Sequence, residues 1–161
     1  MPFNLSVLIE NLSMKKIFIL NGPNLNRLGS REPHLYGSET LADVQSRCLK
    51  KGQALGCEID FRQSNFEGEL VEFIHEAVDC GSGLIINPAG LSFTSVSIMD
   101  ALKMFDGPKV ELHITNVYQR EAVYHHSLMS KVVTGVVTGL GTDGYLLAID
   151  WIDGFLKKSQ S

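Results

Sequence analysis

Several features that would define a class of function are scarce in this sequence of 161 residues. Its three cysteines, Cys48, Cys57 and Cys80, match no C-x-x-C metal or redox spacing, and reduced thiols in a cytoplasmic protein are expected. Its 14 Lys and Arg are outnumbered by 18 Asp and Glu, which disfavours a nucleic-acid partner. No apolar run is long enough to cross a bilayer, so no membrane partner is expected either.

Motifs for cofactors and for serine hydrolases are also missing. The glycine-rich segment 22–38 contains neither G-x-G-x-x-G nor a phosphate loop of the G-x-x-x-x-G-K-[ST] type. No Asp, Glu and His cluster has metal-ligand spacing, and the adjacent His125 and His126 would point about 100° apart on a helix. Residues 90–92 begin like a nucleophile elbow, but Thr94 replaces its closing glycine. Acid–base chemistry without a metal or cofactor remains.

The length and composition favour one globular domain. Domains average roughly 150 residues, and 44% apolar with 20% charged residues is typical of globular proteins. Residues 1–13 contain no Lys or Arg and only a short apolar run, unlike a secretory signal. We therefore interpret residues 1–13 as an extension outside the fold and residues 14–158 as a single domain.

Short apolar segments alternate with amphipathic ones from residue 16 onward. Residues 57–63 alternate apolar with charged side chains, which predicts an edge strand with one wet face. Thr40 and Asp43 have the spacing of a capping box at a helix start. Apolar residues recur at helical spacing from Leu70 to Val78. The expected strands cover residues 16–21, 57–63, 83–87, 109–114 and 132–140, and the expected helices begin near 40, include 70–78, and cover 95–104 and 145–156.

This alternation predicts an α/β fold. Strands separated by helices give right-handed crossovers and a parallel sheet covered on both faces. Five strands in this length predict a flavodoxin-like three-layer sandwich with strand order 2-1-3-4-5. In such sheets, ligands bind beyond the carboxyl ends of the strands, where the strand order reverses. Polar segments 21–37, 87–95 and 113–120 follow the first, third and fourth strands, which predicts a small-molecule site there.

Two residue groups in these segments are suited to acid–base catalysis. Tyr36 shares its segment with Arg27 and Arg31, and a guanidinium favours the phenolate that a tyrosine base requires. Glu111 and His113 are two residues apart on one strand, so their side chains share a face and the carboxylate can orient a protonated imidazole. Packing would equally explain Tyr36 or His113 taken singly.

Six segments resemble the type II 3-dehydroquinate dehydratases, in order and spacing, over essentially all of residues 14–156. They are NGPNLNRLG (21–29), REPHLYG (31–37), QSNFEGEL (63–70), IINP (85–88), VELHITN (110–116) and GLGTDGYLLAI (139–149). The resemblance implies a flavodoxin-like fold and reversible dehydration of 3-dehydroquinate to 3-dehydroshikimate through an enolate, without metal or coenzyme. It places the reaction in the shikimate pathway or in quinate catabolism, and implies trimers that assemble into a dodecamer.

The resemblance also assigns catalytic roles. It implies that Tyr36 removes the proton alpha to the ketone, while Arg31 lowers the pKa of Tyr36 and stabilises the transition state. Asn24 would hold a water against the developing enolate oxygen. His113, oriented by Glu111, would protonate the departing hydroxyl.

Substrate binding is implied for four further positions. Asn87 would contact the ring hydroxyls, and the backbone amides of Ile114 and Thr115 would hold the carboxylate. Asp100 matches an acidic residue that reaches the site of a neighbouring subunit.

Two positions depart from the family pattern. Phe93 stands where a histidine usually touches the substrate, and Tyr124 stands where an arginine usually contacts a substrate hydroxyl. One alternative is therefore a paralogue with weakened substrate binding and low turnover. An alternative of another class is a flavodoxin-type electron carrier.

Overall fold

The computed structural model describes residues 14–30 and 32–161, with the backbone but not the side chain of Tyr36. The proposed extension, residues 1–13, lies outside the described residues, as does Arg31.

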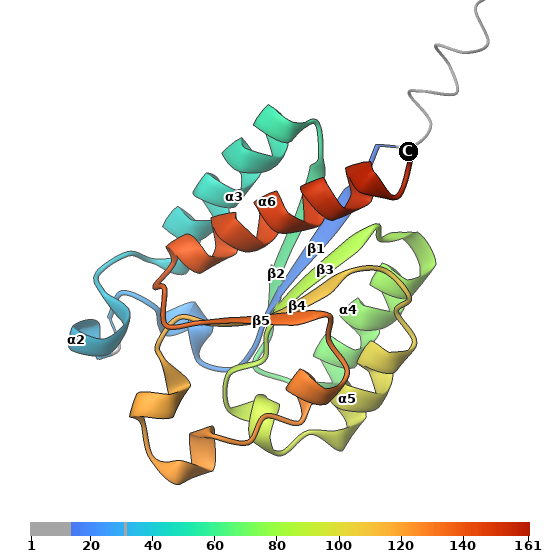
Figure 1. The fold of residues 1–161 in the computed structure, drawn as a ribbon. Coiled ribbons are helices and arrows are strands. Elements are labelled where there is room, and N and C mark those ends of the chain that lie inside the picture. The colour runs from blue at the N-terminus through green and yellow to red at the C-terminus, as the bar shows by residue number, and fades with distance from the viewer. Residues whose placement is uncertain (1–13, 31) are drawn as a thin grey trace, which may run out of the picture.

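The described residues form one parallel sheet. Its strands are β1 (Lys16–Asn21), β2 (Glu58–Gln63), β3 (Gly83–Asn87), β4 (Lys109–His113) and β5 (Gly135–Thr138). The strand order is β2-β1-β3-β4-β5, as predicted (Figure 1). Asn21 at the end of β1 is in register with Gln63 of β2 and Asn87 of β3. Their polar side chains therefore meet at one edge of the sheet.

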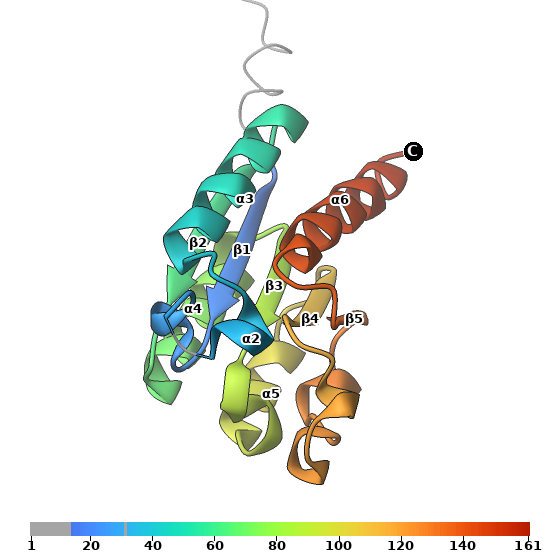
Figure 2. The ribbon, with the colours of Figure 1, turned by 90° about the vertical axis from the view of Figure 1, so that its left-hand side faces the viewer.

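Two pairs of helices cover the sheet and complete the three layers (Figures 1 and 2). One face carries α3 (Leu41–Leu55) and α6 (Asp143–Lys158), and the other carries α4 (Glu67–Cys80) and α5 (Val96–Lys103). The apolar side chains of β1 alternate between the two cores that result: Ile17 and Ile19 join one, and Phe18 and Leu20 the other. Because both faces are buried, β1 and β3 are almost continuously apolar.

Local sequence explains how the segments begin. Thr40 and Asp43 form the predicted capping box at the start of α3, with the Thr40 amide donating to Asp43 Oδ2 at 2.9 Å.

Gly22 allows the chain leaving β1 to pass tightly against the chain leaving β3. A Cβ at residue 22 would lie 2.5 Å from the carbonyl oxygen of Pro88. The Gly22 amide donates to the Asn87 carbonyl at 2.8 Å, which ties the two site loops together.

The main corrections to the predicted elements lie near β5 and in α4. The fifth strand covers four residues rather than 132–140, because Val132 and Val133 pack against the core beneath α5 instead of joining the sheet. Val78 is exposed, since it lies at the margin of the apolar stripe of α4. Sequence periodicity also missed the short helices in the loops: α2 (Pro33–Tyr36) and the 3₁₀ helices η1 (Leu25–Arg27), η2 (Ala89–Phe93), η3 (Val117–Gln119), η4 (Ala122–Tyr124) and η5 (Met129–Lys131).

Candidate active site

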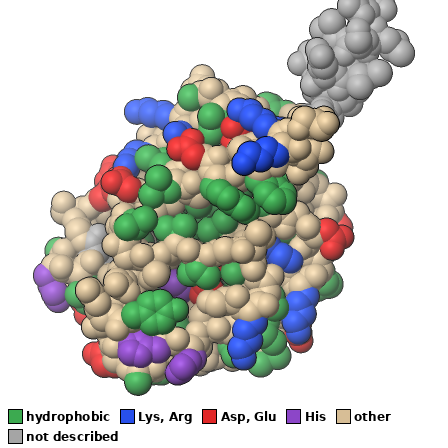
Figure 3. Space-filling model, viewed as in Figure 1, with side chains coloured by type: hydrophobic (Ala, Val, Ile, Leu, Met, Phe, Trp, Pro, Cys, Tyr) green, Lys and Arg blue, Asp and Glu red, His purple; other side chains and the backbone are tan. Residues whose placement is uncertain are grey.

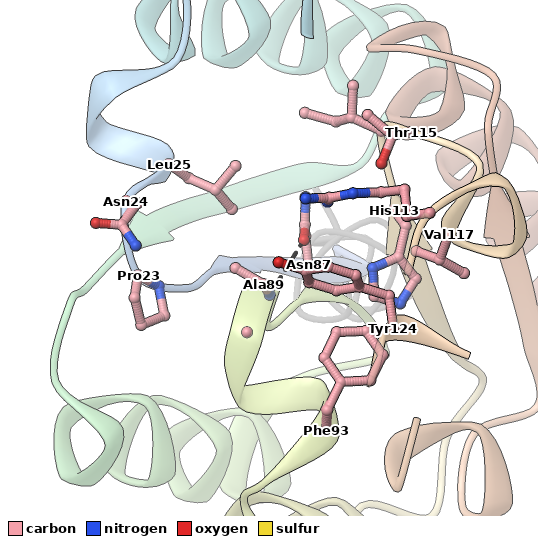
Figure 4. Close-up of a pocket in the computed structure, with 13 residues that line it drawn as sticks. Pro23, Asn24, Leu25, Asn87, Ala89, Phe93, His113, Thr115, Val117 and Tyr124 are labelled. Atoms are coloured by element: carbon pink, nitrogen blue, oxygen red, sulfur yellow. Dashed lines mark hydrogen bonds between the residues drawn. The ribbon is translucent and has the colours of Figure 1, made fainter. Parts of the chain in front are cut away.

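A pocket of about 260 Å³ opens at the carboxyl ends of β1, β3 and β4 (Figure 4). Its lining comes from residues 23–25, 87–93 and 113–124, which are the three loops that the strand pattern indicated. Pockets for drug-sized ligands usually measure about 300–1,000 Å³, so this one suits a small metabolite. Asn24 and His113 lie on different sides of the opening, with Phe93 and Tyr124 on the side of His113.

Glu111 and His113 form a buried pair at the end of β4. Glu111 Oε1 lies 2.7 Å from His113 Nε2, and the Glu111 side chain is fully buried. The second oxygen, Oε2, accepts a hydrogen bond from the Ser130 hydroxyl at 2.5 Å. Burial alone would raise the pKa of Glu111, but hydrogen bonds from His113, Ser127 and Ser130 hold that pKa below its usual value.

The state of Glu111 determines how His113 is oriented. An ionised carboxylate only accepts hydrogen bonds, so Nε2 of His113 carries the proton that it donates to Glu111. Among the described residues, no hydrogen bond engages the other ring nitrogen, Nδ1. Because His113 lines the pocket, Nδ1 is the nitrogen available to a ligand.

Asn87 is held by a second buried network. Its Nδ2 donates to the Tyr145 hydroxyl at 3.1 Å, and that hydroxyl donates to Asn21 Oδ1 at 2.7 Å. Asn87 Oδ1 accepts from the Ala89 amide at 3.3 Å. Burial raises the pKa of Tyr145, so its hydroxyl stays neutral. These contacts fix which side of the Asn87 amide is nitrogen and which is oxygen.

Backbone amides provide a place for an anion at the end of β4. Ile114 and Thr115 line the pocket, and within the described ranges neither amide donates a hydrogen bond to the protein. Their carbonyls are engaged, by the Gly141 amide at 3.0 Å and the Thr138 hydroxyl at 3.0 Å respectively. Two adjacent free amides form a concave site that suits a carboxylate.

Asn24 occupies the opposite side of the pocket in a left-handed backbone conformation, with φ of 71°. Its backbone amide donates to Asn65 Oδ1 at 2.9 Å, and Gln63 Nε2 donates to the same oxygen at 3.1 Å. Asparagine tolerates this conformation better than most residues. The loop after β1 therefore holds the Asn24 side chain at the mouth of the pocket.

The two departures from the family pattern contact each other. Phe93 is stacked with His113, with ring centroids 6.1 Å apart, and meets the Tyr124 ring edge-on at 5.4 Å. The Arg120 guanidinium lies 3.9 Å from the centroid of Tyr124. Phe93, Tyr124 and Arg120 therefore form one continuous cluster beside His113.

The remaining candidates are placed differently. Asp100 is exposed on α5, bonded to Lys103 at 2.9 Å, and does not line the pocket of its own chain. Tyr36 ends α2, and its side chain, like Arg31, lies outside the described residues. Ser92 is buried and does not line the pocket, so Ser92, Asp100 and His113 form no hydrolase triad.

No role was predicted from the sequence for Arg120, Ser127, Ser130 or Tyr145. Arg120 could have been found as the charged residue that ends the polar loop after β4. Ser127 and Ser130 lie more than a dozen residues beyond the strand they support, and Tyr145 lies inside a helix. Only the tertiary fold brings these three to the site.

In residues 14–30 and 32–161 there is no group of three or more His, Cys, Asp or Glu side chains that could hold a metal ion. Over those same stretches, no helix combines the length and apolar character needed to span a membrane.

Comparison with known proteins defines the class. Residues 15–153 match the family described as Dehydroquinase class II, and the chain belongs to this family. It is similar to the 3-dehydroquinate dehydratase of Bartonella henselae, with 57% identity over 84% of this chain and 92% of the relative. The enzyme of the same name from Streptomyces coelicolor is 54% identical over 89% of this chain and 92% of its own.

Solved structures agree with this assignment. The type II dehydroquinase from Propionibacterium acnes superposes with a TM-score of 0.85 and 42% identity, covering 88% of this chain and 99% of that one. A 3-dehydroquinate dehydratase-like protein from Bifidobacterium longum has a TM-score of 0.69 and 31% identity, with 89% and 99% covered. The predicted flavodoxin-like fold is confirmed.

Proposed function

We propose that this protein is a 3-dehydroquinate dehydratase, a hydro-lyase that converts 3-dehydroquinate into 3-dehydroshikimate and water. Membership of the family and the identity to enzymes of that name support the reaction. The observation that carries the proposal is the buried Glu111–His113 pair, which leaves Nδ1 of the imidazole for a ligand in a metabolite-sized pocket. The electron-carrier alternative is not favoured.

The reaction begins with removal of a proton alpha to the ketone. We assign this step to Tyr36 as its phenolate, with Arg31 favouring the ionised form and stabilising the transition state. The electron pair of the C–H bond forms an enolate, whose oxygen is stabilised by a water held by Asn24. Hydrogen-bond donors aimed at such an oxygen are worth roughly 3–4 kcal/mol each.

The second step expels the hydroxyl group. The enolate collapses to the ketone, the C–O bond breaks, and His113 gives its Nδ1 proton to the departing oxygen, which leaves as water. Glu111 stabilises the protonated imidazole before transfer and keeps the remaining proton on Nε2 afterwards. Exchange with solvent returns one proton to His113 and removes one from Tyr36.

Binding groups around the reacting carbons complete the site. We assign the substrate carboxylate to the free amides of Ile114 and Thr115 and the ring hydroxyls to the fixed amide of Asn87. In this assignment, Phe93 and Tyr124 would face the part of the ring that polar residues contact elsewhere in the family. We therefore expect weaker substrate binding, which is the feature of the paralogue alternative. It should raise KM without abolishing the reaction.

We further propose a homo-oligomer in which trimers assemble into a dodecamer. Apolar side chains gather on the surface over α6 and β5 (Figure 3). Val136, Leu147 and Trp151 are each more than 40% exposed and line a groove of about 170 Å³. Strand β5 is an edge strand, and burying an apolar edge in an interface protects it from aggregation. Asp100, exposed on α5, would contact the substrate in a neighbouring subunit. Light scattering that shows a monomer of 17.7 kDa would contradict this proposal.

We place the enzyme in the cytoplasm, in the shikimate pathway or in quinate catabolism. We also propose that residues 1–13 are an extension that the single domain, residues 14–158, does not require. Activity of a variant that begins at Met14 tests this directly, because a variant that fails to fold or assemble would show that the extension is part of the structure.

An ultraviolet assay tests the reaction. The product is a conjugated enone and the substrate is not, so turnover of 3-dehydroquinate raises the absorbance. Tyr36→Phe is expected to abolish this signal while leaving the affinity for 3-dehydroquinate largely intact, since its hydroxyl acts in the transition state. No signal with the unmodified protein would reject the proposed function. Retention of most of the turnover by Tyr36→Phe would reject Tyr36 as the base.

A further inference from the structure

The turn formed by residues 127–130 closes the buried end of the Glu111–His113 pair. Ser130 lies 19 residues after Glu111 in the sequence, yet its hydroxyl donates a hydrogen bond to Glu111 Oε2 at 2.5 Å. The other carboxylate oxygen is bonded to His113. A carboxylate in a buried position with one oxygen unpaired would be strongly destabilised. The serine hydroxyl therefore occupies the place where water would otherwise be needed.

The turn is itself firmly held. The Leu128 amide donates to the Ser92 carbonyl at 2.8 Å, which ties the turn to η2 in the loop after β3. The Met129 side chain is fully buried in the core beneath α5, and its amide donates to the Ser127 hydroxyl at 3.1 Å. The Ser130 hydroxyl is thus presented from a fixed backbone, although Ser130 itself is exposed.

We infer that Ser130 is a positioning residue for the proton donor: it orients the Glu111 carboxylate, and Glu111 in turn orients His113. The inference rests on the proposed function, because it gives His113 the role of general acid. Ser130 contacts neither the pocket nor the reacting atoms, so it acts only through Glu111. Ser127, on the same turn, also lowers the pKa of Glu111 by hydrogen bonding.

The charged surroundings of the pair stay the same when Ser130 is changed. Arg120 and Tyr124, on the loop after β4, line the pocket beside His113. Lys131 follows Ser130 and is exposed. Substitution of Ser130 removes one hydroxyl and no charge, so its effects can be assigned to the hydrogen bond on Glu111.

Steady-state kinetics of Ser130→Ala test the inference. Loss of one hydrogen bond to a charged group is expected to lower kcat about tenfold or more, with KM changed little because Ser130 does not touch the substrate. Losing this bond raises the pKa of Glu111, so the acid limb of the kcat profile should move to higher pH. Ser130→Thr keeps a hydroxyl and should recover most of the turnover. An unchanged kcat would overturn the inference. So would a fall in kcat accompanied by an equal change in KM, with the pH profile of kcat unmoved.

Ser159→Ala is the matched control. Ser159 also donates one side-chain hydrogen bond, to the Phe155 carbonyl at 3.1 Å, but it lies at the end of α6. This variant should keep the kcat and pH profile of the unmodified protein. If Ser130→Ala does not fold, the comparison of Ser130→Thr with the unmodified protein replaces it, and a hydroxyl-bearing variant without turnover would overturn the inference.

A spectroscopic measurement separates this inference from the proposed function. The proton on His113 Nε2, bonded to a carboxylate at 2.7 Å, should give a downfield proton resonance in the NMR spectrum. Ser130→Ala should shift or broaden this resonance, whereas Ser159→Ala should not. The result holds even for a protein that does not turn over 3-dehydroquinate. A resonance that is unaffected by Ser130→Ala would overturn the positioning role whatever the reaction is.

Discussion

The pocket lining and the residue that supports it, Glu111, are stabilised in two different ways. Glu111, His113 and Asn87 are held by directional hydrogen bonds within buried networks. Phe93 and Tyr124 are held by ring contacts with each other, with His113 and with Arg120. Hydrogen bonds define where a proton or lone pair points, whereas ring packing defines mainly shape. We therefore expect Glu111 and His113 to control turnover, and Phe93 and Tyr124, together with Asn87, to control affinity.

Among the residues of these two groups, the largest effect is expected from His113→Ala, which removes the general acid. Positioned acid–base groups contribute typically about 10²–10⁴-fold to rate, so kcat should fall by this factor. KM should change little, because Asn87 and the Ile114 and Thr115 amides remain. The ultraviolet assay measures both constants. If KM rises instead and kcat persists, His113 binds the substrate rather than protonating it.

Glu111→Gln should have the next largest effect. The amide keeps the shape but loses the charge that stabilises a protonated imidazole, so kcat should fall roughly tenfold to a hundredfold at pH 7, consistent with about 1.5–3 kcal/mol for a hydrogen bond to a charged group. His113 remains in place, so the loss should be smaller than that of His113→Ala. Equal losses in the two variants would mean that His113 cannot act at all without the carboxylate.

The same variant tests the pH dependence of stability. Burial alone would raise the pKa of Glu111, but its hydrogen bonds lower it, so the ionised group stabilises the folded state above its ordinary pKa of about 4.3. This contribution is lost as the pH falls through the lowered pKa of the folded protein. Thermal melts of the unmodified protein should therefore drop more steeply with acid than those of Glu111→Gln. If the melting temperatures of the two proteins fall in parallel with decreasing pH, ionisation of Glu111 does not stabilise the folded state.

Tyr145→Phe should have a moderate effect on both stability and affinity. Its hydroxyl joins Asn21 and Asn87, and its removal leaves two buried amide atoms without a partner, at a cost of about 1–3 kcal/mol. The melting temperature should fall, and KM should rise because the Asn87 amide is no longer fixed. Tyr118→Phe is a control, since Tyr118 is 62% exposed. An unchanged KM in Tyr145→Phe would separate the network from substrate binding.

The parts of the site that sequence predicted are those governed by local spacing. Strand alternation placed Glu111 and His113 on one face, and the ends of apolar strands located the three loops of the pocket. The fold followed from the same alternation. The predicted first and last residues were right for β1 and β3, where both faces of the strand are buried. Spacing could not reveal Ser130 or Tyr145, because their contacts with Glu111 and Asn87 span 19 and 58 residues of chain.

The contact between Phe93 and Tyr124 was also invisible in the sequence. The two positions lie on separate 3₁₀ helices, η2 and η4, whose short length gives no periodic pattern. Each residue taken singly indicates the loss of a polar contact with substrate. Together, the two rings form a packed cluster whose members support each other.

The smallest effect is expected from restoring polar residues at these two positions, with Phe93→His and Tyr124→Arg. The new side chains would add hydrogen bonds to the substrate, worth about 1.5–3 kcal/mol for a charged partner and about half that for a neutral one. They would also remove the ring contacts, worth about 0.5–1.5 kcal/mol for an aromatic pair and about 0.5–2 kcal/mol for the contact of Arg120 with Tyr124. The two contributions largely oppose each other.

We therefore expect the double variant to raise kcat/KM by about tenfold or less, a change of about 1.4 kcal/mol, mainly through KM. The double variant should perform better than the sum of the two single effects predicts. Each single variant leaves one ring of the cluster without its partner while gaining only part of the polar contact. Kinetic constants for 3-dehydroquinate in all four proteins give the coupling energy directly. Additive single effects would show that the two positions act independently. If the double variant leaves kcat/KM unchanged, the aromatic cluster already supplies as much affinity as the polar pair, and Phe93 and Tyr124 do not limit substrate binding.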